Sequence, residues 1–475
     1  MKTYRRDCHD AIEERKVLSI GSLAEFAERY GYYVVQSLLI FFLIEKFNIS
    51  QELSASLVGT ALAMIYISAI VGGYIAERLL GYYRAGLLGS ALMLMGYFLL
   101  ASASSKDGLC LGLGLICISS GLIKSNMAAF IGRFYDRSSF DDSRRDFGFN
   151  VFYMGINLGG FLGLVLATSL KDHFGYDIAF YSSLVVNLLM FVMLCSGYKF
   201  IDKHMLDIRF SLLIVLRVCL ILVVYISLLF YVFKYPIVAD YSVLASAIAS
   251  IVILFLSIKK SSVSKVLAAS IFFLLSIVYW ALYFQMYICL LLFVEYSVKQ
   301  YLLNSSQILS VTMLTVLIFA VIMGKLWMYL ASKDRMTNDI DKFNLAFVIM
   351  TLAFIVIELF IYATPGVIKV SPFAFIIGYF IIGISELCIS AIGLSLVTKI
   401  APKGFVALYM GIWLITLGIG GKLGGILSSY FYIPETDVVL AKTNMADGLD
   451  AFILIAVITS LVILVIRKYM NKYST

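Results

Sequence analysis

Long apolar runs recur along the whole sequence and restrict its fold more than any other feature. We count fourteen, centred near residues 32, 64, 94, 119, 158, 187, 221, 248, 280, 317, 351, 385, 416 and 460. Many are long enough to cross a bilayer, which takes about 20 residues. Their continuous apolar character predicts helices rather than the alternating strands of a membrane barrel. The chain is 62% hydrophobic and 14% charged, so we predict an all-α, multi-pass membrane protein.

The basic residues predict how these spans are oriented. Fourteen is an even number, so both termini should lie on one side of the membrane. The loops and tails on that side hold 25 Lys and Arg, whereas those on the other side hold 7. Cytoplasmic loops are the basic ones, so we expect both termini in the cytoplasm. The net charge of +8 therefore reflects topology, and we expect no nucleic-acid partner.

Several other classes find no support in the sequence. The seven cysteines are scattered and form no close pair, which argues against both a disulfide framework and a metal site. We find no nucleophile–base set, so we do not expect an enzyme. The first residues are too polar for a cleaved signal peptide, and the first apolar segment should stay in the protein.

One apolar run contains a stripe of polar side chains. At helical spacing these residues share one broad side, and they are Glu25, Glu28, Arg29, Tyr32, Tyr33 and Gln36. Ionisable groups at membrane depth are costly, so the stripe should face a protein interior or a wet cavity. Glu25 and Arg29 have the favourable i,i+4 order for an ion pair.

The second carboxylate makes this stripe a candidate switch. One guanidinium neutralises two acids imperfectly, burial disfavours a charged carboxylate, and a nearby cation favours it. Such an acid can take up and release a proton when its partner or its access to water changes. A structural ion pair is the alternative, but one glutamate would suffice for that.

Two further charges in the spans bear on a ligand. Lys124 needs an acid or water, and we expect it to face the Glu25/Glu28 stripe. A cavity with Arg29 and Lys124 would attract a carboxylate such as a peptide C-terminus. Glu386 has no basic residue within helical reach, so its partner must come from another helix, water or a ligand. Opposite the two cations it would suit a zwitterion.

Other residues are open to a structural interpretation. Gly155, Gly159 and Gly163 form a small-xxx-small ladder that favours close helix packing. Asn157 could hydrogen-bond a substrate or join two helices, and Trp413 could pack or bind. We interpret Lys422 as a cation that is paired within the bundle or reaches toward a span end.

At these residues the sequence resembles the proton-dependent oligopeptide transporter family of the major facilitator superfamily. The resemblance covers almost the whole chain in the family's order. Its blocks are Glu25–Tyr33, Gly72–Gly81, Lys124–Asn126, Phe152–Gly159, Trp280–Gln285, Ser385–Leu387 and Gly393–Pro402. Fourteen spans resemble the bacterial members, in which two extra helices separate two six-helix bundles. We therefore predict an N-terminal bundle over 1–200, extra helices and linkers over 201–262, and a C-terminal bundle over 263–475.

The resemblance implies a proton-coupled symporter that imports di- and tripeptides across a bacterial inner membrane by alternating access, with the site between the halves near the midplane. It implies proton coupling by Glu25, Glu28, Arg29 and Lys124. It implies substrate binding by Arg29, Tyr32, Tyr33, Tyr66, Lys124, Asn157, Trp280, Gln285, Glu386 and Trp413. Arg29 and Lys124 would hold the peptide carboxylate, and Glu386 its amine. We expect a monomer in the lipid bilayer that uses protons and no other cofactor.

The sequence departs from the family at several positions. Phe284 stands where an acid is common, and Gln36 stands where that acid's basic partner is common. Thr312 replaces an asparagine that helps to bind the amine, and Ser125 replaces a proline. These changes leave open an alternative in which the fold and proton coupling are kept but the cargo is a non-peptide metabolite. A membrane scaffold or sensor that does not transport is a third possibility.

Overall fold

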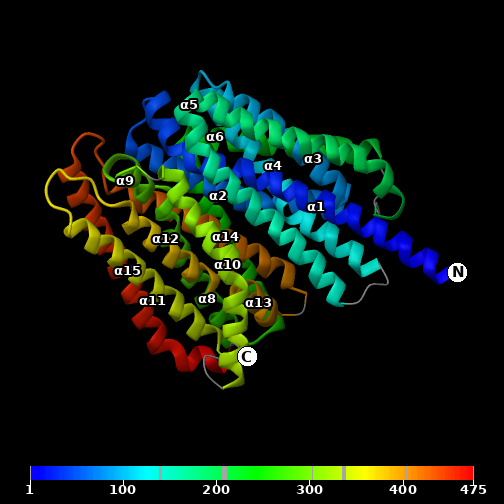
Figure 1. The fold of residues 1–475 in the computed structure, drawn as a ribbon. Coiled ribbons are helices and arrows are strands. Elements are labelled where there is room, and N and C mark those ends of the chain that lie inside the picture. The colour runs from blue at the N-terminus through cyan, green and yellow to red at the C-terminus, as the bar shows by residue number, and fades with distance from the viewer. Residues whose placement is uncertain are drawn as a thin grey trace. The chain divides into compact units, whose positions relative to one another are not determined.

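The computed structural model describes residues 2–137, 142–205, 211–301, 303–333, 338–402 and 404–473. These parts are almost entirely helical, and their only β pairing is a bridge between Val298 and Val370 (Figure 1). The α-helices are α1 (Lys2–Phe41), α2 (Gln51–Ile75), α3 (Tyr82–Ala101), α4 (Lys106–Arg137), α5 (Asp142–Met205), α6 (Leu212–Lys234), α7 (Pro236–Ser257), α8 (Val263–Tyr283), α9 (Cys289–Ser297), α10 (Ser305–Ser332), α11 (Asp339–Tyr362), α12 (Pro372–Leu387), α13 (Ser390–Ile400), α14 (Val406–Ser429) and α15 (Val438–Tyr473).

These helices have the length and composition of membrane spans. Eleven helical stretches in the described residues are long and apolar enough to cross a membrane. One of them, 147–198, is interrupted at Gly175, whose φ of 84° is non-helical. The predicted centres at 32 and 385 lie in α1 and α12, outside those eleven. Each of the fourteen predicted centres therefore lies in a helical segment of its own, and the all-α membrane prediction is confirmed.

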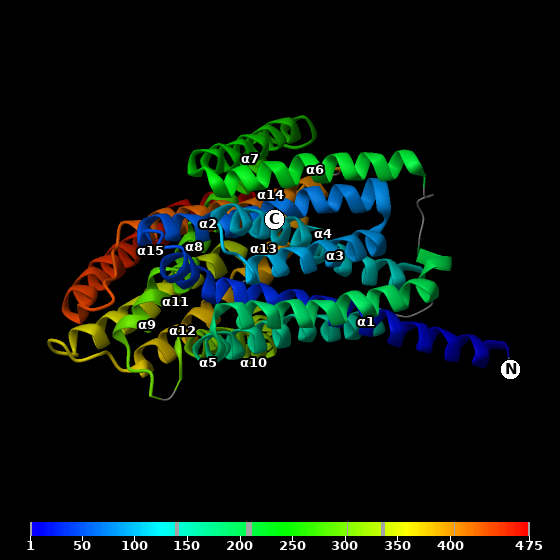
Figure 2. The ribbon, with the colours of Figure 1, turned by 90° about the horizontal axis from the view of Figure 1, so that it is seen from above.

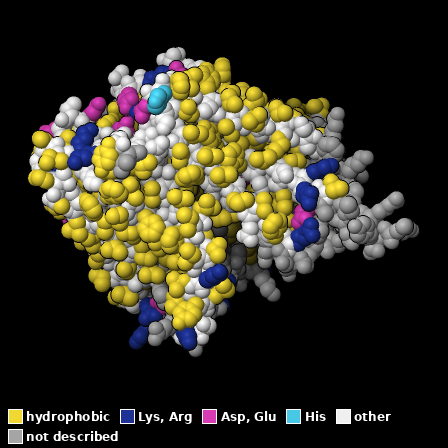
Figure 3. Space-filling model, viewed as in Figure 1, with side chains coloured by type: hydrophobic (Ala, Val, Ile, Leu, Met, Phe, Trp, Pro, Cys, Tyr) yellow, Lys and Arg dark blue, Asp and Glu magenta, His cyan; other side chains and the backbone are white. Residues whose placement is uncertain are grey.

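The surface has the character expected beside lipid. Apolar side chains such as Val321, Met328, Leu352 and Leu359 are exposed on α10 and α11. Figure 3 shows a face covered by hydrophobic side chains, with charged ones mostly toward its margins. Lipid tails are as apolar as these side chains, so their exposure is not costly in a bilayer.

The helices gather into two compact units. Unit 1 comprises 1–38 and 64–238, and unit 2 comprises 39–63 and 239–475. The first half of α2 therefore belongs to unit 2 and its second half to unit 1. The inserted pair is also divided, because α6 lies in unit 1 and α7 in unit 2. The predicted domain boundaries at 200 and 262 stay predictions, and part of that linker, 206–210, lies outside the described residues.

Close backbone contacts build unit 1 around α1. A Cβ added at Gly155, Gly159 or Gly163 of α5 would meet the backbone of Ser22, Phe26 or Tyr30 of α1, respectively. The packing predicted from this glycine ladder is confirmed. In the same unit α4 packs on α3 and α6, and Figure 2 shows α6 running alongside α4. This packing places α1 and its polar stripe in the interior of unit 1.

Unit 2 is built around α8 and α14. Gly420 of α14 lies against the Trp280 Cβ of α8, and Gly424 lies against the Ala281 carbonyl. Aromatic rings of α8 pack edge-to-face or tilted, as Trp280 does against Tyr279, Tyr283 and Phe284. Helices α11, α12 and α15 pack in the same unit.

Candidate functional site

The polar stripe of α1 forms a buried ion cluster in unit 1. Glu25, Glu28 and Arg29 are each 5% exposed or less. The Arg29 guanidinium contacts both oxygens of Glu28, with Nη2 2.6 Å from Oε1 and Nε donating to Oε2. The same Nε lies 3.8 Å from Glu25 Oε1. The fork-on-fork contact with Glu28 is the strong geometry for a guanidinium and a carboxylate, so Arg29 is committed chiefly to Glu28.

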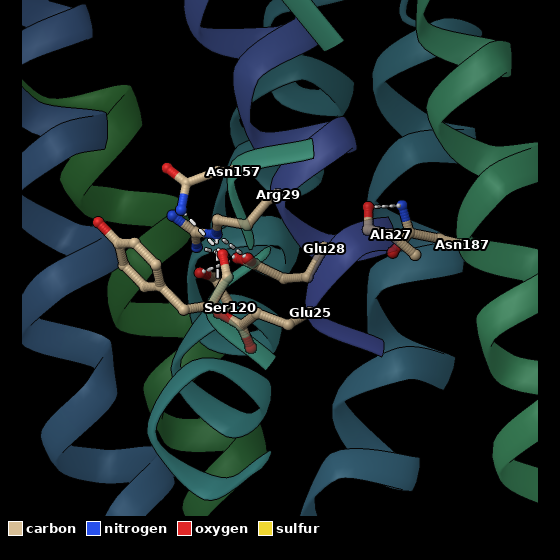
Figure 4. A network of polar contacts seen from close by, with 8 residues as sticks. Glu25, Ala27, Glu28, Arg29, Ser120, Asn157 and Asn187 are labelled. Atoms are coloured by element: carbon tan, nitrogen blue, oxygen red, sulfur yellow. Dashed lines mark hydrogen bonds and ion pairs between the residues drawn. The ribbon is translucent and has the colours of Figure 1, made fainter. Parts of the chain in front are cut away.

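Ser120 of α4 completes the shell of Glu28. Its hydroxyl donates to Glu28 Oε1 at 2.6 Å, as Figure 4 shows. Within the described part of the chain, Glu25 Oε2 is buried and has no hydrogen-bond partner. The two acids are thus unequal: Glu28 is held by a guanidinium and a hydroxyl, whereas Glu25 has a distant ion-pair partner and one bare oxygen. Of the two acids, Glu25 therefore has the less complete set of partners.

Lys124 lies where the sequence predicts it. Its ammonium sits 4.3 Å from the centre of the Tyr66 ring and is near enough to Arg29, Glu28 and Glu25 to interact electrostatically with each. Arg29 in turn lies 4.5 Å from the Tyr32 ring centre. Aromatic faces stabilise such cations when water is scarce. The cluster therefore brings two acids and two bases together, with a lysine not committed to one carboxylate.

The remaining predicted residues of unit 1 surround this cluster. Tyr32 and Tyr33 are in edge contact with ring centres 4.9 Å apart. Asn157 is 4% exposed, and its amide donates to the Tyr153 carbonyl of its own helix; Figure 4 shows it beside Arg29. Gln36 is buried, and neither amide atom has a partner within the described residues.

Glu386 is the corresponding ionisable group of unit 2. The Tyr283 hydroxyl donates to its carboxylate at 2.6 Å, and Ser390 is a second hydrogen-bonding neighbour. No ion pair to Glu386 is formed within the part of unit 2 that the structure describes. The acid is stabilised by hydroxyl groups and not by a cation. Beside it, the buried Trp280 has an indole N–H without a partner in that same part of the chain.

Gln285 and Trp413 are used for packing in this structure. The Gln285 amide donates to Ala281 and Gly424 carbonyls at 2.7 and 3.1 Å, and its oxygen accepts from Ser428 at 2.5 Å. These bonds hold α14 against the end of α8. Trp413 is 3% exposed and lies directly against Gly393. Their contact with substrate stays a prediction, as does the role of every residue named above.

Sequence reasoning missed Ser120, Tyr97 and Tyr283. Ser120 lies four residues before Lys124, hence on the same helix face, and that spacing was an available signal. Tyr97 is fully buried beside Glu28 and Arg29, with its hydroxyl against Gly31. Nothing in the sequence around Tyr97 shows that α3 turns this ring toward α1.

The chain is similar in sequence to known permeases. The sequence model of the POT family (PTR2) matches residues 83–445. Similar curated relatives include dipeptide and tripeptide permease B of Salmonella typhimurium, 27% identical over 86% of each chain. The permease B of Aeromonas hydrophila is 27% identical over 97% of this chain and 94% of its own.

Solved structures share the fold. A crystal structure of the peptide transporter POT with sulfate has a TM-score of 0.83 at 24% identity and covers 96% of this chain and 95% of its own. A POT family transporter in complex with 5-aminolevulinic acid has a TM-score of 0.80 at 24% identity, over 95% and 96%. These neighbours confirm the predicted major facilitator fold. The family match covers more than half of the sequence, and the chain belongs to the POT family of transporters.

Proposed function

We propose that this protein is a proton-coupled symporter that carries di- and tripeptides into the cell, with both termini in the cytoplasm. The observation that carries the proposal is the cluster of Glu25, Glu28, Arg29 and Lys124, buried together in unit 1. Family membership and permease relatives support peptide as the cargo. The excess of basic residues on one side supports the orientation.

The unequal state of the two acids suggests how a proton is coupled to transport. Glu28 is ion-paired with Arg29 and hydrogen-bonded to Ser120, so both of its carboxylate oxygens have partners. Glu25 has a buried oxygen without a hydrogen-bond partner among the described residues. It interacts electrostatically with Lys124. Protonation of Glu25 removes its electrostatic attraction for Lys124, and the lysine can then bind a substrate carboxylate. Release of the proton restores that attraction and competes with the substrate.

Substrate charge fits the same residues. In unit 1, Arg29 and Lys124 are the candidate partners of the peptide carboxylate, with the aromatic faces of Tyr32 and Tyr66 beside them. Within the described residues of unit 2, Glu386 forms no ion pair, and it is our candidate for binding a positively charged amine. We propose that protons are the coupling ion and that no other cofactor is needed.

The test is dipeptide uptake into proteoliposomes under an imposed proton gradient. We expect the wild type to accumulate labelled dipeptide above its equilibrium level. Glu25→Gln should abolish this accumulation yet retain exchange of labelled for unlabelled dipeptide, because exchange needs no net proton movement. Undiminished accumulation by Glu25→Gln would remove the coupling claim.

A non-peptide cargo is the second candidate. It is favoured by Phe284 and Gln36, which replace a charged pair common in the family, and by the similar transporter solved with 5-aminolevulinic acid. A thermal-shift screen of dipeptides against amino acids and other small zwitterions separates the two. Stabilisation only by non-peptides would replace the peptide assignment and keep the proton mechanism.

A further inference from the structure

Lys422 is a buried cation outside the cluster of unit 1. It lies in α14 and is 3% exposed. Its ammonium donates to Ser56 Oγ and Thr60 Oγ1 of α2, each at 3.1 Å. It also lies 3.0 Å from the Asp240 carboxylate of α7. One side chain thus joins three helices, and all four residues belong to unit 2.

The helices around this lysine meet backbone to backbone. A Cβ at Gly59 of α2 would meet the Gly421 carbonyl and Gly425 of α14. A Cβ at Gly421 would in turn meet Leu62. The Lys422 side chain is buried beside this backbone contact, and a buried charge is tolerated only when paired and hydrogen-bonded. Two of the three contacts to Lys422, those with Ser56 and Thr60, therefore depend on α2 staying packed on α14, an interface that we call the α2–α14 seam.

Asp240 is the anionic partner of this lysine, and it comes from an inserted helix. Much of the α7 surface is apolar and exposed, including Tyr241, Ile248 and Ile251. Toward its other end, the Ser257 hydroxyl bonds to Tyr409 of α14 at 2.8 Å. Asp240 itself is half exposed. Helix α7 thus reaches α14 through one polar contact near each end, and the first of these supplies the countercharge of Lys422.

We propose that Asp240 and Lys422 are positioning residues for transport, and that α7, through the countercharge of Asp240, keeps Lys422 bonded to the first half of α2. Helix α2 continues to Tyr66, the ring beneath Lys124, so the seam fixes one end of a helix that carries a site residue at its other end. Opening the seam breaks the two contacts of Lys422 with α2 and leaves its ammonium with Asp240 of α7 alone. The pair therefore sets the population of the state in which α2 leaves α14. The inference rests on the proposed function in supposing that helices move to carry cargo.

The seam can be probed independently of cargo. In a cysteine-free background, Leu62→Cys places a thiol in the seam, to be labelled with a membrane-impermeant maleimide added to either side. We expect Asp240→Asn to speed this labelling about tenfold and to lower the maximal uptake rate, because the lysine loses its countercharge. The matched control is Asp107→Asn, which removes the exposed pair between α4 and Lys234 of α6. It should change labelling by less than about twofold.

Two further variants separate this role from folding. Lys422→Met with Asp240→Asn should label no faster than the faster of the single variants, because partners of one contact are non-additive. Asp240→Glu should restore slow labelling. Equal labelling of Asp240→Asn and Asp107→Asn would overturn the proposal. A wild type that transports no peptide but shows the labelling difference would refute the proposed function and leave the seam assignment intact.

Discussion

The two units bury charge in different ways. Unit 1 holds two acids and two bases within one cluster, so its charges neutralise one another. Among the described residues of unit 2, the acid Glu386 has hydroxyl partners and no ion pair, whereas Lys422 and Asp240 form a separate pair. In a cluster of paired charges, binding of one proton changes which acids and bases are paired. An acid without an ion pair can instead bind a cation of the substrate. The comparison suggests that unit 1 responds to protons and unit 2 responds to the cation of the cargo.

The largest effect should follow from removing the charge of Glu386. Glu386→Gln is expected to reduce uptake of a dipeptide with a free amine about 100-fold, because a charged hydrogen-bond partner contributes about 2–3 kcal/mol. Uptake of an N-acetylated dipeptide, which has no charged amine, should fall less than about fivefold in the same variant. Competition for uptake measures both.

The matched control for Glu386 is Tyr283→Phe, which removes the donor at 2.6 Å and keeps the acid. It should cost less than Glu386→Gln with either dipeptide. Equal losses for the free and the acetylated dipeptide in Glu386→Gln would contradict an amine-binding role and erase the contrast between the units.

Loss of the two-point contact between Arg29 and Glu28 in unit 1 should give the next largest effect. Arg29→Lys keeps the positive charge but loses the two-point contact with Glu28, and such sites do not treat the two bases alike. We expect gradient-driven uptake to fall about tenfold, equal to about 1.4 kcal/mol. If Arg29→Lys transports like the wild type, a simple positive charge is enough and the geometry of the fork is irrelevant.

A smaller effect tests whether the unequal acids matter. Ser120→Ala removes one hydrogen bond to Glu28 at a cost of about 1 kcal/mol. We expect a several-fold loss of gradient-driven accumulation with exchange less affected, because Glu28 becomes more like Glu25. Ser119→Ala is the control, since that hydroxyl bonds to the Leu115 carbonyl of its own helix. Identical behaviour of the two variants would show that Ser120 has no special role.

The smallest effect on transport is expected at Gln285. Gln285→Met removes its bonds to Gly424 and Ser428 and should lower stability by about 1–3 kcal/mol, seen as a lower unfolding temperature in detergent. If Gln285 serves packing alone, the substrate concentration for half-maximal uptake should stay within about twofold. A large rise in that concentration would support the predicted contact of Gln285 with the substrate.

Much of this arrangement could be predicted from the sequence. Apolar runs gave the helices, and helical periodicity placed Glu25, Glu28 and Arg29 on one side of α1. The cost of burying Lys124 correctly predicted that it lies near those acids. Periodicity describes one helix only and does not say how it is rotated against its neighbours. For that reason the bonds of Ser120 to Glu28 and of Gln285 to α14 could not be predicted, nor could the contact of Lys422 with α7.

The glycine ladder between α1 and α5 has a consequence for engineering. The three glycines of α5 pack directly on the α1 backbone at Ser22, Phe26 and Tyr30. With no α5 side chain between the helices at these points, α1 and α5 should not slide past each other. The two segments should move together as a rigid body. A fluorophore or spin label attached to a cysteine in place of the exposed Leu158 of α5 would then report the displacement of the α1 acids without contacting them. The motion of these acids could thus be followed in real time.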